Sequence, residues 1–65
     1  MKEEWTGELI GKMHNKDITL DDLAEEIGVG KSYVSMILNG KRNPSGARER
    51  LYSAFEKIAE RKEKI

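Results

Sequence analysis

Apolar residues recur every three or four positions along most of this chain. Trp5, Leu9 and Met13 stand at four-residue spacing, which is typical of one face of an amphipathic helix. Residues 20–27 carry apolar side chains at the first, fourth, fifth and eighth positions, and this spacing predicts a second, two-turn helix. Similar patterns predict helices over about residues 31–38 and from residue 44 or 45 onward. We expect an all-α fold, a compact bundle of four to five helices with a long C-terminal helix.

Polar residues and glycines indicate where these helices begin and end. Thr19 can cap the second helix, and Asp22 follows three residues later, as in a capping box. Gly28 can adopt the left-handed conformation that closes that helix, and Asn39 with Gly40 supplies the next stop. The last helix is expected to start near Pro44 or the following serine. With about twenty residues it would span roughly 30 Å and overhang the bundle.

Length and composition limit the possible architectures. The chain has 65 residues, of which 37% are hydrophobic and 37% charged, and a domain of this size buries only roughly 60% of its unfolded surface. One domain over residues 1–65 is therefore expected. There is no cysteine, the N-terminal segment lacks the pattern of a signal peptide, and no run reaches the roughly 18 apolar residues of a membrane span. We expect a cytoplasmic protein without cofactor, metal or membrane partner.

Charge is distributed unevenly although the net charge is zero. Residues 1–30 contain three lysines and eight acids, which gives −5, so residues 31–65 carry +5. Between Lys31 and Arg50, five basic residues accompany a single acid, Glu49. This arrangement allows a positive patch for nucleic acid on a neutral molecule. An unevenly charged surface without a partner is the alternative.

The predicted third helix has two chemically distinct faces. Successive side chains lie 100° apart, so an inner arc and an outer arc can be assigned. The inner arc holds Val34, Ile37 and Leu38, and the outer arc holds Ser32, Ser35, Met36 and Asn39. The outer arc contains no carboxylate, which suits a surface that approaches phosphates.

The segment from Thr19 to Arg42, TLDDLAEEIGVGKSYVSMILNGKR, resembles the helix-turn-helix of the lambda-repressor and Cro-like group, also called the XRE family. The threonine cap, the Leu-Ala pair, the Ile-Gly-Val turn and the Asn-Gly-Lys that follows the third helix carry the resemblance. It implies that residues 31–38 lie in the major groove of double-stranded DNA, while residues 20–27 cross the backbone.

Roles for individual residues follow from this resemblance by position. Those implied to contact base edges are Lys31, Ser32, Ser35 and Met36. Those implied to contact the DNA backbone are Tyr33, Asn39, Lys41 and Arg42. A lysine can donate to guanine O6 or N7, a serine can donate or accept, and a methionine can contact a thymine methyl.

Two departures from the family pattern bear on specificity. Leu20 stands where the family often has a glutamine that bonds a phosphate, and the chain contains no glutamine at all. The bidentate glutamine contact to adenine is therefore absent. Specificity then rests on Lys31, on methyl contacts or on the shape of the DNA site.

Together these features predict a transcriptional regulator, a repressor of a phage or mobile element, that binds operator DNA as a homodimer. The C-terminal helix is the candidate dimer surface, and its predicted contact residues are Tyr52, Phe55, Ala59 and Ile65. The alternative is an antitoxin-like or adaptor-like module that binds a protein. Enzymatic activity and a small-molecule substrate are not expected, because one histidine, His14, and scattered serines cannot supply a nucleophile, a base and an orienting group.

Overall fold

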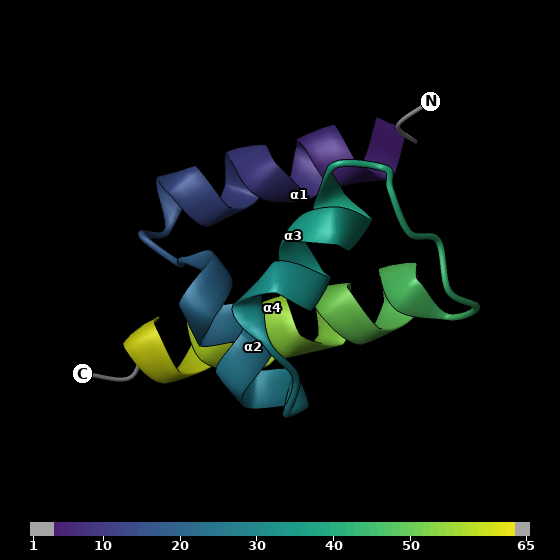
Figure 1. The fold of residues 1–65 in the computed structure, drawn as a ribbon. Helices are drawn as coiled ribbons and strands as arrows, with labels where there is room; N and C mark the ends of the chain where they lie inside the picture. Colours follow the sequence, from purple (N-terminus) through teal and green to yellow (C-terminus); the bar gives the residue numbers. More distant parts are fainter. Residues whose placement is uncertain (1–3, 64–65) are drawn as a thin grey trace.

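The computed structural model describes residues 4–63 and contains four helices in that range. They are α1 (Glu4–Asn15), α2 (Leu20–Ile27), α3 (Lys31–Leu38) and α4 (Ala47–Glu63). In Figure 1, α1 and α4 run along opposite edges of the molecule, and α3 lies between them. The predicted all-α bundle with a long last helix is confirmed.

One hydrophobic core joins all four helices. Each helix contributes the apolar face that its periodicity indicates, and the turn between α1 and α2 adds Ile18. The innermost side chains, essentially without exposed surface, are Leu9, Leu23, Val34 and Leu51. Trp5 is also buried, and its ring lies 6.3 Å from that of Tyr52 between centroids. The core therefore holds α3 by its inner face, which gives its outer face a defined orientation.

The start of α2 is closed by the predicted capping box. The Asp22 backbone N–H donates to Thr19 Oγ1 at 3.2 Å, and the Thr19 backbone N–H donates to an Asp22 carboxylate oxygen at 2.9 Å. The second bond is the main reason why the pKa of Asp22 lies below its usual value. At the other end Gly28 has φ 86°, and its N–H donates to the Ala24 carbonyl at 2.8 Å. The turn into α3 is thus fixed by local backbone geometry.

We expect Thr19→Ala to lower the free energy of unfolding by about 0.5–2 kcal/mol, because it removes the hydroxyl oxygen that accepts the Asp22 backbone N–H. Urea denaturation followed by circular dichroism at pH 7 measures this change. Thr19→Ser is the matched control, since it keeps the hydroxyl and should stay near the wild-type value. Equal losses in both variants would contradict a role for the hydroxyl.

The last helix begins later than predicted. It starts at Ala47 rather than near Pro44 or Ser45. The Ala47 N–H donates to the Pro44 carbonyl in a turn, and Gly46 has φ 77°, which is incompatible with a right-handed helix. The helical dihedrals therefore begin only after Gly46.

Two ion pairs connect the C-terminal end of α4 to neighbouring elements. Lys16 Nζ lies 3.0 Å from a Glu63 carboxylate oxygen, and the Arg61 guanidinium pairs with Glu26 of α2. The hydrogen bond from Arg61 is the main cause of the lowered pKa of Glu26. These two ion pairs connect the last turn of α4 to the α1–α2 turn and to α2.

Two of the predicted dimer contacts on α4 need correction. Phe55 and Ala59 are only 7% and 9% exposed and belong to the core of the single chain. Tyr52 is half-buried against Trp5, with the Lys12 ammonium 5.4 Å from its ring centroid. Ile65 lies outside the described residues. The error arose because this 17-residue helix packs against both α1 and α2 and uses more of its circumference for the core than one apolar stripe suggests.

None of the helices within residues 4–63 combines the length and the apolar character that a membrane-spanning segment requires.

Candidate nucleic-acid interface

Helix α3 is anchored by one face and presents the other to the outside. Val34, Ile37 and Leu38 are buried, as the 100° spacing predicts. On the opposite side Lys31 and Ser32 are exposed, and Ser35 and Met36 are half-buried. The four residues predicted to contact bases therefore share the surface that the core leaves open. The two in the first turn project furthest into solvent, which suits reading of base edges by the N-terminal residues of a recognition helix.

An acidic side chain of α2 lies beside the N-terminus of α3, although α3 itself contains no acidic residue. Lys31 Nζ lies 3.8 Å from an Asp21 carboxylate oxygen in the first turn of α2, and both side chains are mostly exposed. The outer face of α3 itself carries no carboxylate, but the fold places one beside its first residue. Reading the helices separately missed Asp21. The sequence signal that could have identified Asp21 was its position next to Leu20, where the family resemblance implies a contact with the DNA backbone.

At the C-terminus of α3 the Asn39 side chain folds back onto the helix. Its Nδ2 donates to the Ser35 carbonyl at 2.8 Å and to Ser35 Oγ at 3.1 Å. An amide nitrogen has two hydrogens, so Nδ2 must release at least part of this pairing before it can donate to a phosphate. Two residues predicted for different roles, Ser35 at bases and Asn39 at the backbone, are thereby joined in one unit.

The basic loop after α3 is attached to the end of that helix. The backbone N–H groups of Lys41 and Arg42 donate to the Met36 carbonyl at 2.8 and 3.2 Å, and Gly40 permits this turn with φ 79°. Both basic side chains are exposed. The Arg42 guanidinium carbon lies 5.8 Å from the centroid of the half-buried Tyr33 ring. Three of the residues predicted to contact the DNA backbone therefore lie in one region at the margin of α3.

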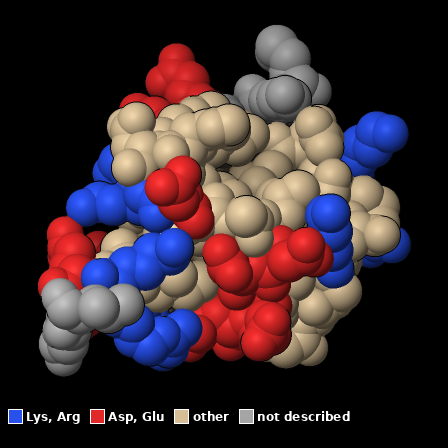
Figure 2. All heavy atoms as spheres, turned by 90° about the vertical axis from the view of Figure 1, so that its left-hand side faces the viewer, with Lys and Arg blue, Asp and Glu red and all other residues tan. Residues whose placement is uncertain are grey.

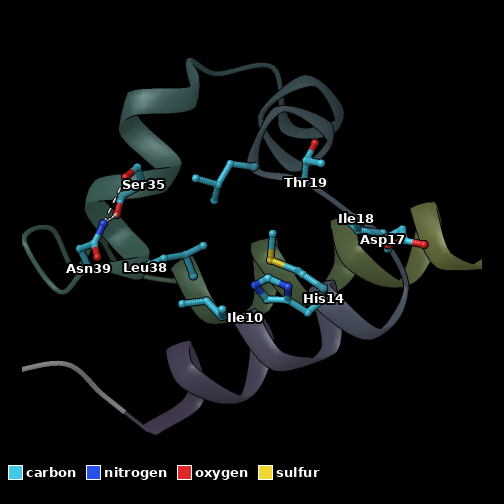
Figure 3. A pocket seen from close by; sticks show the side chains of 10 residues that line it. Ile10, His14, Asp17, Ile18, Thr19, Ser35, Leu38 and Asn39 are labelled. Atoms are coloured by element: carbon cyan, nitrogen blue, oxygen red, sulfur yellow. Dashed lines mark hydrogen bonds between the residues drawn. The ribbon is translucent and has the colours of Figure 1, made fainter.

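A hollow lies between α1, the α1–α2 turn and α3, with a volume of about 560 Å³. In Figure 3, Ile10 and His14 face it from α1 and Leu38 from α3, while the Asp17 carboxylate points away. The Ser35–Asn39 unit forms part of its margin. The hollow thus adjoins the predicted DNA-binding surface on the side of α1. The exposed His14 stands at its wall.

Acidic and basic side chains occupy different parts of the surface. Figure 2 shows acidic side chains gathered below a hollow among uncharged residues, with Lys and Arg to either side. Helix α2 has four acids and no basic residue. Within residues 4–63 no three His, Asp or Glu side chains are placed to hold a metal ion. The site therefore consists of the outer face of α3 and the basic loop, with an acidic helix beside it.

Comparison with known families bears on this arrangement. The model of the helix-turn-helix family matches residues 13–48, more than half of the chain, and covers α2, the turn, α3 and the basic loop. Comparison with curated proteins and with solved structures gave no significant match. The predicted resemblance is confirmed by the family match and by the observed helix order. The chain belongs to the helix-turn-helix family of DNA-binding regulatory domains, in its lambda-repressor and Cro-like group.

Proposed function

We propose that this chain is a sequence-selective transcriptional regulator that inserts α3 into the major groove of double-stranded DNA. The observation that carries the proposal is the outer face of α3, which has exposed hydrogen-bond donors in its first turn. Two basic residues follow the helix, and their backbone N–H groups are hydrogen-bonded to its last turn. The base-contact residues would be Lys31, Ser32, Ser35 and Met36. Tyr33, Asn39, Lys41 and Arg42 would position the helix through phosphates and sugars.

The chain would act as a single DNA-binding domain and regulate by occupying an operator. One helix of eight residues reads few base pairs, so a homodimer on a two-fold site, with half-sites about 34 Å apart, is the arrangement that gives enough specificity. Repression of a phage or mobile element is the role we propose. Since Phe55 and Ala59 are buried within one chain, the dimer surface has to use other residues.

A protein-interaction module is the second candidate, and one observation favours it. Helix α2 carries four acids and no basic residue of its own. Lys31 and Arg61 pair with only two of them, and a net acidic surface suits a basic protein partner better than DNA. Selection from a random-sequence pool of duplex DNA at two salt concentrations separates the two functions. Enrichment of a two-fold symmetric site supports the operator-binding regulator, while no enrichment at either salt concentration supports the protein-interaction module.

In the same selection, Lys31→Ala and Met36→Ala should each change the enriched sequence. A good base contact discriminates by about 1–3 kcal/mol, so preference at the affected base pair should fall about five- to hundredfold. Lys57→Ala on α4 is the control, because it removes one exposed charge away from α3 and should leave the enriched sequence unchanged. If the enriched site stays the same in both variants and only affinity falls, these residues do not contact bases.

A further inference from the structure

The first turns of α2 and α3 meet at the margin of the proposed DNA-binding surface. Lys31 Nζ and the Asp21 carboxylate are 3.8 Å apart, with 60% and 70% of the two side chains exposed. An exposed pair of this kind contributes only about 0–1 kcal/mol to folding. Any larger effect of the pair is therefore expected on DNA binding, at whose proposed surface it lies, rather than on folding stability.

The N-terminus of α2 is also poorly suited to attract phosphate. A helix N-terminus ordinarily favours anions through its dipole and its free N–H groups. Here Asp21 and Asp22 stand in the first turn. The Asp22 carboxylate already accepts the Thr19 N–H, and the neighbouring side chain, Leu20, cannot form a hydrogen bond. Negative charge and an apolar side chain occupy the place where the family resemblance implies a phosphate contact.

We propose that Asp21 is a specificity-determining residue that acts through Lys31 and weakens nonspecific DNA binding. This inference rests on the proposed function. In a nonspecific complex, lysine contributes chiefly by the attraction of its charge to phosphates, and a carboxylate at 3.8 Å makes the local net charge zero. In a specific complex, guanine O6 and N7 accept directional hydrogen bonds from the ammonium at short range. Those bonds need the donor hydrogens of Lys31 rather than a net positive charge.

Asp21→Asn tests the proposal by removing the charge and keeping the size of the side chain. Affinity for a scrambled duplex should rise about three- to tenfold, and its dependence on salt should steepen by about one unit. Affinity for the selected site should rise less, so the ratio of the two affinities falls. Glu25→Gln is the matched control: it removes the same charge from another exposed residue of α2, and the ratio should stay at the wild-type value.

Repeating Asp21→Asn in a Lys31→Ala background shows whether the two residues act together. In that background Asp21→Asn should no longer change the ratio of the two affinities. If the ratio still falls, Asp21 does not act through Lys31. If the wild-type chain is selective but Asp21→Asn leaves the ratio unchanged, or Glu25→Gln lowers the ratio equally, the role of Asp21 is overturned and the proposed function stands. A wild-type chain with equal affinity for selected and scrambled duplexes would instead overturn the proposed function and, with it, this inference.

Discussion

Leu23→Ala should leave much of the protein unfolded at 25 °C. The Leu23 side chain is 0% exposed and lies among the innermost residues of the core. Truncating a buried leucine to alanine costs about 2–5 kcal/mol, from lost burial and from the cavity that remains. A single core in a domain of this size rarely supplies more than about 3–5 kcal/mol. The loss is thus comparable with the whole stability of the domain.

Circular dichroism during urea denaturation measures this effect, and Leu20→Ala supplies the matched control. Leu20 lies on the same helix but is half-buried at the hollow between α1 and α3. Its truncation should cost about 1 kcal/mol. Equal losses for the two variants would contradict the assignment of Leu23 to the centre of the core.

Replacing Lys41 and Arg42 together by alanine should weaken binding to every DNA sequence. Both residues are exposed on a loop whose backbone is bonded to the last turn of α3, so their charges stay near the proposed groove-binding face. Each lost phosphate contact should flatten the dependence of affinity on salt by about one unit, and two lost contacts should lower affinity about ten- to hundredfold at low salt. The enriched site sequence should not change.

Titration of one duplex over a series of salt concentrations checks this expectation. Lys57→Ala with Lys62→Ala is the matched control, because it removes the same net charge from exposed positions on α4. That double variant should keep a slope close to wild type. An unchanged slope in the Lys41 and Arg42 variant would place these residues away from the phosphates.

Much of the fold could be predicted from local sequence signals. The capping box at Thr19, the left-handed Gly28 and the burial of Val34, Ile37 and Leu38 all follow from side-chain chemistry or from the 3.6-residue period, and all are confirmed. The start of α4 was misplaced because two local signals competed. A proline favours the first turn of a helix, but Gly46 at positive φ delays that turn until Ala47.

The candidate site was predictable only in part. The sequence and its family resemblance placed eight residues along and just after α3, and their interactions within the structure became apparent only from the fold. Asn39 is bonded to Ser35, and Arg42 lies near the Tyr33 ring. Neither geometry follows from spacing alone, because each depends on side-chain torsions and on the path of the loop. The roles of these residues on DNA stay predictions.

The sequence by itself determined the helices, their inner faces and the membership of the helix-turn-helix family, because periodicity, caps and turn glycines act over a few residues. The tertiary structure alone decided what lies beside those faces. It buried Phe55 and Ala59, joined the end of α4 to the α1–α2 turn and to α2, and brought Asp21 to Lys31. These contacts connect residues of different elements, and their existence depends on how the helices pack around one core.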